Sequence, residues 1–338
     1  MKRLRTVSII LIVLFVLTAC SQNPGTNDNN NSQNPGKPAE APKEAPAAAA
    51  GGDQDNGSGS NENNTIYPVT VTDSFNREIS VEEEPKKVIS LSPAITEIVF
   101  ALGQGDKLIG RTDFCDYPQE ALEVKSVGGG PMDPNIEKVV ELEPDIVFAS
   151  AHFQEEVLNK LEESNVKVVI LYGENSFDGA YEIIEKVGYI LNAQKAASKI
   201  VDSMKETVAD VLQRVEGLDK PSVYYVAGFG EWGDYTAGRD TFIGQLIEMA
   251  GAKNAADDVE GWSYSLEKLI EKNPDYLICS KLDNHKEQLK TANGYKDLDA
   301  IINDRVLEID KNMLERQGPR LAEGLKEIAK YIHPEAFE

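Results

Sequence analysis

The sequence predicts an α/β protein with two parallel-sheet lobes, a single long α-helix that joins them, and a ligand cleft between the lobes. Three observations carry this prediction. Short apolar runs alternate with helical patterns, an internal repeat occurs once in each half, and a long amphipathic pattern separates the two groups of runs. Strands separated by helices at this spacing form mostly parallel sheets that are covered on both faces.

Six short apolar runs are predicted as buried strands. They lie at 87–92, 145–150, 166–172, 222–228, 275–280 and 305–310. The runs fall into two groups of three, and the chain from Thr65 onward, about 274 residues, is long enough for two lobes.

The internal repeat supports the division into two lobes. NIEKVVELEPDIVFAS at 135–150 aligns without gaps to SLEKLIEKNPDYLICS at 265–280, with six of the sixteen positions identical. Each copy is predicted as a helix that ends before a Pro-Asp turn into a parallel strand. Unrelated α/β units can also look alike in this way, so a chance similarity stays open as the alternative.

The long amphipathic pattern predicts the joining helix. Apolar residues recur every three to four positions between Ala197 and Val215, and Gly217 and Pro221 close the pattern. A helix from Gln194 to Glu216 is roughly 34 Å long. We therefore predict an N-terminal lobe at 65–193, a bridging helix at 194–217 and a C-terminal lobe at 218–338, with little closure on ligand binding.

The first 64 residues are predicted to stay outside the folded part. Residues 1–19 combine basic residues with a short apolar stretch and are interpreted as a signal peptide that is removed. Leu-Thr-Ala-Cys at 17–20 resembles the bacterial lipobox, which implies a diacylglycerol on Cys20; an ordinary secretory signal is the alternative. Residues 20–64 lack large apolar side chains after the cysteine and are predicted to form a disordered tether.

Charge and composition exclude several functions. The net charge is −23, with 34 Lys and Arg against 57 Asp and Glu, which makes nucleic acid an implausible partner. The three histidines show no metal-binding spacing, so we expect no metal site; His152 as an axial ligand to haem iron stays open. No hydrolase or P-loop motif occurs, and the GxGxxG at Gly228–Gly233 lacks the helix that a dinucleotide site needs.

Three segments resemble a known family. PKKVISLSPAITEIVFALGQGDKLIGRTDFCDYP at 85–118, LEPDIV at 142–147 and ERQGPR at 315–320 are similar to class III substrate-binding proteins of ABC importers. These are helical-backbone lipoproteins of the periplasmic-binding-protein family that receive cobalamin, ferric siderophores and haem. The resemblance covers 67–335, and SPAITE followed by DYP is nearest to the cobalamin receptor.

The resemblance implies which side chains line the cleft. Phe114, Tyr235 and Trp262 fall at aromatic ligand contacts of the cobalamin receptor, and Arg316 falls at an arginine that contacts the ligand. Arg316 could bind a phosphate, propionate or siderophore carboxylate, and its alternative is a surface ion pair with Glu315 or Asp310. Trp232 and Phe153 lie at strand ends and are further candidates for the walls of the cleft. Arg239 is a weaker candidate of the same kind as Arg316.

The chain also departs from the cobalamin pattern. Pro131 and Met132, and then Ser150, stand where that receptor has tryptophans, and Asn312 replaces an acidic contact. The identity of the chelate, whether corrinoid, siderophore or haem, therefore stays open.

Glu137 and Glu267 correspond to the two glutamates with which the family docks on its permease, and they share one position of the repeat. We therefore expect a monomeric protein, not an enzyme and without a cofactor of its own, that is anchored on the extracytoplasmic face of the cell membrane. It would deliver a metal chelate, with a corrinoid first, to an ABC permease and its ATPase. The alternatives from other classes are a non-transport surface lipoprotein and a secreted hydrolase.

Overall fold

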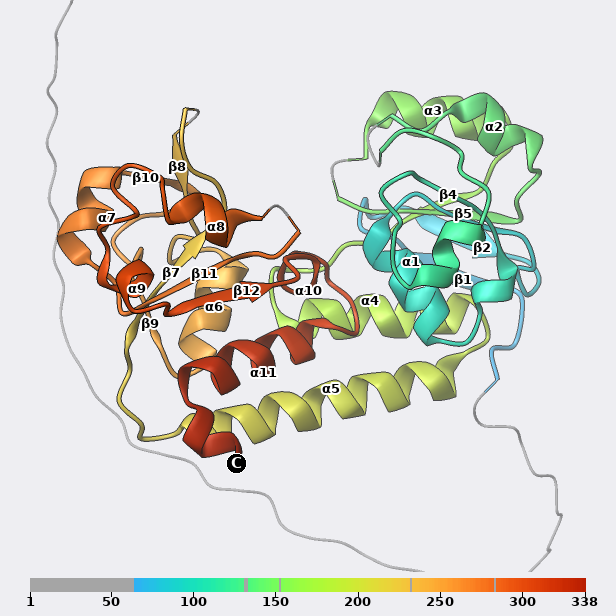
Figure 1. Cartoon of the computed structure of the whole chain (residues 1–338). Helices are drawn as coiled ribbons and strands as arrows, with labels where there is room; N and C mark the ends of the chain where they lie inside the picture. Colours follow the sequence, from blue (N-terminus) through green and yellow to red (C-terminus); the bar gives the residue numbers. More distant parts are fainter. Residues whose placement is uncertain (1–63, 131–132, 152, 232, 283) are drawn as a thin grey trace, which may run out of the picture. The chain divides into compact units, whose positions relative to one another are not determined.

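The computed structural model describes residues 64–130, 133–151, 153–231, 233–282 and 284–338. Gly59–Glu338 forms one compact unit, whose elements are labelled in Figure 1. The signal segment, Cys20, Trp232 and His152 lie outside the described residues.

The N-terminal lobe is built on a parallel sheet in which every adjacent pair of strands is parallel. Its strand order is β4 (Leu108–Arg111), β3 (Val88–Ser90), β5 (Ile146–Ala149) and β6 (Val168–Ile170). Strands β3, β5 and β6 are buried along their whole length, as expected for strands covered on both faces. The other elements are the antiparallel hairpin β1 (Val69–Thr72) and β2 (Glu78–Val81), the helices α1 (Pro93–Ala101), α2 (Ile136–Glu141), α3 (Glu155–Glu163) and α4 (Phe177–Ile190), and the 3₁₀ turns Gly105–Lys107 and Gln119–Glu123.

The C-terminal lobe carries a second parallel sheet. Its strand order is β9 (Lys253–Asn254), β7 (Ser222–Val226), β11 (Tyr276–Ser280) and β12 (Val306–Ile309). A short antiparallel pair, β8 (Asp234–Tyr235) with β10 (Ser263–Tyr264), stands apart from this sheet. The helices are α6 (Phe242–Met249), α7 (Leu266–Lys272), α8 (His285–Leu289), α9 (Asp299–Ile302), α10 (Asn312–Glu315) and α11 (Leu321–Ile332), and a 3₁₀ turn follows at Pro334–Phe337.

The two sheets have the same topology. Written in the same direction, the orders β4-β3-β5-β6 and β9-β7-β11-β12 place the repeat copy of each lobe, α2–β5 and α7–β11, at the same point of its sheet. The aspartate of each copy also accepts equivalent hydrogen bonds. Asp145 accepts hydrogen bonds from the backbone N–H groups of Lys86 and Lys87 just before β3, and Asp275 accepts one from the N–H of Ser222 at the start of β7, all at 2.8 Å.

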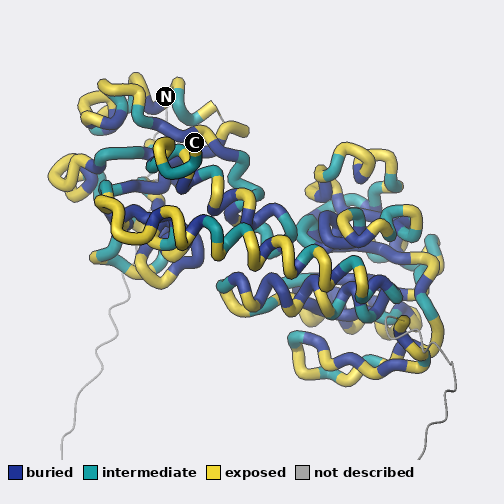
Figure 2. Tube along the Cα trace, turned by 90° about the horizontal axis from the view of Figure 1, so that it is seen from below, coloured by how far each residue is buried: buried dark blue, intermediate teal, exposed yellow. Residues whose placement is uncertain are grey.

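Helix α5 (Gln194–Val215) has 22 residues, about 33 Å at 1.5 Å per residue. Its buried side packs against α4 and α11, and Figure 1 shows α11 running beside it. In Figure 2 exposed positions recur along the helices while strand positions are largely buried.

One hydrophobic core passes through both lobes. It includes Val88 and Ile146 of the first sheet, residues of α4, α5 and α11, and Val223 and Ile278 of the second sheet. The rings of Phe177 at the start of α4 and Phe242 at the start of α6 meet edge to face, with centroids 5.5 Å apart. The predicted fold class is confirmed. The two lobes nevertheless do not have fully separate hydrophobic cores, because residues of α4 and α11 belong to the core that both lobes share.

Candidate functional site

A cleft lies where both lobes meet the segment 315–317. It consists of two adjoining cavities of about 320 and 250 Å³, which share Asn175, Glu315 and Gln317. The first lobe contributes Ser92, Pro93, Ala94, Ile95, Ser150, Ala151, Leu171 and Ile183, and the second contributes Asp240, Thr241, Phe242, Ile243, Gly261, Trp262, Leu314 and Arg316.

The cleft walls come from the turns that follow strands. Ser92, two residues after β3, caps α1 by accepting a hydrogen bond from the N–H of Ile95, and Pro93 occupies the first helical position. Thr241 caps α6 in the same manner through the N–H of Gly244. Ligands of open α/β sheets bind in this region, outside the carboxyl ends of the strands.

Three of the predicted aromatic residues are exposed. Phe114, Tyr235 and Trp262 keep 61%, 40% and 45% of their surface accessible, which is unusual for large apolar side chains. Trp262 lines the cleft directly. Tyr235 is its neighbour on the β8–β10 pair, where the N–H of Thr236 donates to the carbonyl of Trp262. Phe114 lies beside Arg316, whose guanidinium donates to the Phe114 carbonyl at 3.4 Å.

Two other candidates, like Phe114 and Tyr235, are not among the residues that line the two cavities. Phe153 is only 5% exposed and packs in the second core cluster of the N-terminal lobe, because its side chain covers the sheet rather than the cleft. Arg239 forms an exposed ion pair with Glu260 at 2.7 Å. The third, Trp232, lies outside the described residues.

Arg316 is part of an ion-pair network between the lobes. Its Nη1 lies 2.8 Å from Glu97 Oε1 and 2.8 Å from Asp116 Oδ1, both in the N-terminal lobe. The alternative pairing with Glu315 or Asp310 is therefore not observed as an ion pair of Arg316. Because the Arg316 side chain is only 13% exposed, these contacts fix it at the edge of the cleft.

Glu97 was not among the residues that the sequence singled out. Its carboxylate is 2% exposed and also holds Arg320, with Nε on Oε2 and Nη2 on Oε1, each at 2.8 Å. Arg320 binds Asp310 as well and stacks 3.8 Å from the ring centre of Tyr117. Burial alone would lower the pKa of Arg320, but the hydrogen bonds to Glu97 outweigh it and raise that pKa. The signal was available, since Glu97 is the one charged residue in the apolar helix PAITEIVFA.

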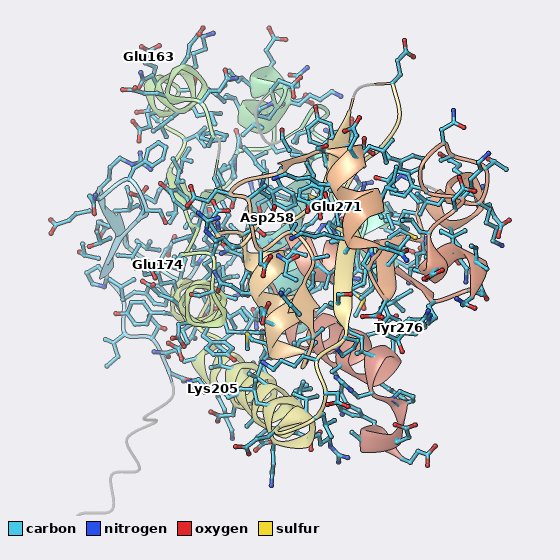
Figure 3. The ribbon with its side chains drawn as sticks, turned by 90° about the vertical axis from the view of Figure 1, so that its left-hand side faces the viewer. Glu163, Glu174, Lys205, Asp258, Glu271 and Tyr276 are labelled. Atoms are coloured by element: carbon cyan, nitrogen blue, oxygen red, sulfur yellow. The ribbon has the colours of Figure 1, made fainter. Side chains whose placement is uncertain are left out.

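A second polar contact joins the lobes beside this network. Gln317 Oε1 accepts from the N–H of Gly173, and its Nε2 donates to the carbonyl of Glu174, which is labelled in Figure 3. The segment 315–317 is therefore tied to the N-terminal lobe at two places.

The two predicted docking glutamates occupy equivalent places. Glu137 and Glu267 are each the second residue of their helices, after the capping residues Asn135 and Ser265, and both are exposed. Ser265 Oγ donates to Glu267 at 2.6 Å and lowers the pKa of that carboxyl.

Lysines beside Glu267 are already paired. Lys268 and Lys272 bind Asp258, and Lys272 lowers the pKa of the Asp258 carboxyl. Figure 3 labels Asp258 together with Glu271, which is exposed on the same helix as Glu267. These two lysines therefore pair with Asp258 rather than with Glu267.

Within the described residues, no group of three or more His, Cys, Asp or Glu side chains is arranged to hold a metal ion. No helix of the described part is both long and apolar enough to cross a bilayer. Cys279 is a fully buried core residue, and this burial raises the pKa of its thiol to about 12.

Two parallel-sheet lobes on one long helix, with a cleft between them, define the class of solute-binding proteins that serve transport and are not enzymes. The chain belongs to the periplasmic binding protein family, whose model matches residues 88–313.

The similar proteins agree with this assignment. An uncharacterised ABC transporter substrate-binding lipoprotein of Bacillus subtilis, YvrC, is 34% identical over 280 residues, which cover 81% of this chain and 88% of that protein. A cobalamin-binding protein of Halobacterium salinarum is 30% identical over 279 residues, covering 79% and 74% of the two chains. A solved structure from Staphylococcus epidermidis, described as a possible iron-binding, periplasmic solute-binding protein, is 32% identical with a TM-score of 0.64 and covers 74% of this chain and 99% of its own.

Proposed function

We propose that this chain is the substrate-binding protein of an ABC importer and captures a metal chelate, with a corrinoid such as cobalamin as the first candidate. The observation that carries the proposal is the cleft itself: Trp262 and a fixed arginine, Arg316, line its two adjoining cavities, and the exposed Tyr235 and Phe114 lie next to these two residues. The cobalamin-binding relative of Halobacterium salinarum supports the corrinoid.

The chemistry of the cleft suits a large flat chelate with an acidic edge. Aromatic faces such as Trp262 and Tyr235 bury much ligand area without requiring fixed hydrogen bonds. Arg316 supplies a planar cation that pairs well with a carboxylate or phosphate.

An iron chelate is the second candidate of the same class. It is favoured by the possible iron-binding description of the similar Staphylococcus epidermidis structure. Ser150 supports it as well, since it lines the cleft where the cobalamin receptor is expected to have a tryptophan.

The ligand class is tested by titrating the full chain, purified in detergent, with cyanocobalamin, haemin and a panel of ferric siderophores. The chain has two tryptophans, so its fluorescence reports largely on Trp262 and Trp232. Submicromolar quenching by one chelate, weakened in Trp262→Ala but not in Phe153→Leu, is expected. No response to any chelate would contradict the proposed ligand class.

Capture is proposed to occur with little closure of the lobes. The shared core, the Phe177–Phe242 contact and the Gln317 hydrogen bonds all oppose a hinge motion. A nearly preformed cleft lowers the ordering cost of binding. Small-angle scattering with and without the bound chelate should give the same radius of gyration, and a marked decrease would refute this part.

Delivery is proposed to use Glu137 and Glu267 as one docking acid on each lobe. Reversing both to Lys should abolish uptake of the chelate in cells while leaving ligand affinity in vitro unchanged. Glu163→Lys with Glu335→Lys, two exposed acids outside the repeat positions, is the matched control. Equal uptake by both double variants would exclude this docking role.

Membrane attachment is proposed to depend on a lipid on Cys20, as the lipoprotein name of the Bacillus subtilis relative suggests. Two acyl chains suffice for stable anchoring, whereas one is marginal. Cys20→Ala should move the protein from the membrane fraction to the supernatant. Retention in the membrane would contradict the lipid anchor.

A further inference from the structure

Asp116 differs from the other acids of the network between the lobes. Glu97 and Asp310 have side chains that are 2% and 16% exposed, whereas the Asp116 side chain is 51% exposed. It lies in the loop between β4 and the Gln119–Glu123 turn, outside any helix or strand. Its carboxylate makes one ion-pair contact, with Nη1 of Arg316 at 2.8 Å.

The buried part of the network is electrically balanced without Asp116. The two guanidiniums of Arg316 and Arg320 are matched by the two carboxylates of Glu97 and Asp310. Asp116 is therefore a surplus anion, and removing it leaves no buried charge without a partner. A pair with one half-exposed partner contributes little to stability and opens more easily than the buried pairs of the network.

Arg316 stays in place when Asp116 leaves. Glu97 holds the same Nη1, the carbonyl of Phe114 accepts from Nη2, and the side chain is mostly buried. A guanidinium Nη carries two N–H groups, so displacement of Asp116 frees one donor on an arginine that lines the cleft. That donor faces the half-exposed position of Asp116, where the acidic group of a ligand can accept from it.

We propose that Asp116 occupies the anion position of the cleft and is displaced by the acidic group of the ligand, so that Arg316 and Asp116 together select chelates that carry a peripheral carboxylate or phosphate. This inference rests on the proposed capture of a chelate. A ligand without such a group leaves the Asp116–Arg316 pair intact and gains no binding free energy from Arg316. A ligand with one replaces the contact and removes the repulsion between two anions.

The test compares chelates that differ in their acid groups. Haemin is paired with its dimethyl ester, in which both propionates are masked, and cyanocobalamin with cobinamide, which lacks the phosphate. Asp116→Asn and Asp116→Ala should bind the acid-bearing member about threefold to fivefold more tightly than the unchanged protein, as expected for a partly exposed ion pair. The masked member should bind equally to all three proteins.

Asp113→Asn is the matched control. Asp113 is an exposed acid of the same loop, and it accepts from Ser126 Oγ at 2.5 Å rather than from Arg316. Asp113→Asn removes the same charge as Asp116→Asn. An equal gain in affinity for the acid-bearing chelate in both variants would overturn the inference, because it would show a general repulsion between the acids of the loop and the ligand.

A second test uses inorganic phosphate in place of a chelate. Phosphate should raise the melting temperature of Asp116→Asn more than that of the unchanged protein or Asp113→Asn. Adding Arg316→Met to Asp116→Asn should remove this effect. If phosphate behaves this way while no chelate binds, the proposed function fails and the anion position stands. If chelates bind but Asp116 and Asp113 variants respond alike to chelates and phosphate, the inference is wrong and the proposed function stands.

Discussion

The two lobes share a scaffold and differ in the loops around the cleft. Both have four parallel strands in the same order, the same helix-turn-strand repeat and an aspartate that caps the neighbouring strand. The loops around the cleft are built differently. The repeat therefore keeps what holds each sheet and presents an exposed glutamate, Glu137 or Glu267, in each lobe.

The cleft loop of the N-terminal lobe is held by an arginine. Arg111, 8% exposed on β4, donates from Nε to the carbonyl of Ala121 at 2.7 Å and from Nη1 to that of Thr112 at 2.9 Å. These bonds fix the loop that carries Phe114 and Asp116.

The aromatic pair of the C-terminal lobe is held by a tyrosine. Tyr295, 1% exposed, donates from its hydroxyl to Asp234 Oδ1 at 2.7 Å, at the base of β8. Burial raises the pKa of Tyr295, so the hydroxyl remains a donor. The position of Tyr235 therefore depends on a core residue of its own lobe.

The largest expected effect concerns the contact that joins the lobes. Glu97→Ala leaves Arg316 and Arg320 without their shared carboxylate and should cost about 3–5 kcal/mol of unfolding free energy. Denaturant unfolding measures this. Glu163→Ala, on the exposed side of α3, should stay within about 0.5 kcal/mol of the unchanged protein. Equal losses in the two variants would show that the network does not stabilise the lobes.

The next effect compares equivalent core positions of the repeat. Val139 and Leu269 are both fully buried at the same repeat position. Leu269→Ala should cost about 2–5 kcal/mol in the same unfolding assay. Val139→Ala should cost less, because fewer carbons are removed from the core. A larger loss in Val139→Ala would indicate that the two copies are packed differently.

A smaller, pH-dependent effect compares the capping aspartates. Burial raises the pKa of Asp275, but the hydrogen bonds from Ser222 outweigh it and hold that pKa below its ordinary value. A carboxyl with a lowered pKa in the folded state stabilises above its unfolded pKa, about 3.9, and loses this contribution as the pH falls through the folded pKa.

Asp275→Ala should therefore cost about 1.5–3 kcal/mol at pH 7, and the difference from the unchanged protein should shrink below about pH 4. Asp145→Ala, at the more exposed cap, should cost less. Unfolding measured at several pH values checks both. A pH-independent difference for Asp275→Ala would contradict the carboxylate role.

The smallest effect is a gain. Glu143 and Asn273 share a repeat position, and both have left-handed backbones, with φ of 48° and 41°. Asparagine tolerates this conformation better than glutamate. Glu143→Asn should therefore stabilise the protein by about 0.5–1 kcal/mol. Asn273→Glu should destabilise it, since it also loses hydrogen bonds to Asp299. Thermal unfolding of both variants measures these changes in stability. A lower stability of Glu143→Asn would contradict the prediction.

Much of the fold could be predicted from local pattern. The six apolar runs correspond to β3, β5, β6, β7, β11 and β12. Strands β1, β2, β4, β8, β9 and β10 were not predicted. In β4 the run LIGR is interrupted by a glycine, and the two-residue strands β8, β9 and β10 have no period of their own. The aromatic candidates Phe114, Tyr235 and Trp262 could be named from resemblance, and they are exposed beside the cleft.

The sequence by itself determined six buried strands, the long helix and the repeat, since these depend on spacing between neighbouring residues, and its motifs carried the family resemblance. Only the tertiary structure decided which charges meet. Arg316 and Glu97 are 219 residues apart, and no local pattern pairs them. It also decided that Phe153 is a core residue and that α4 and α11 join the lobes into one core. Such contacts depend on how two sheets pack around a shared helix, and side-chain burial there is fixed by distant parts of the chain.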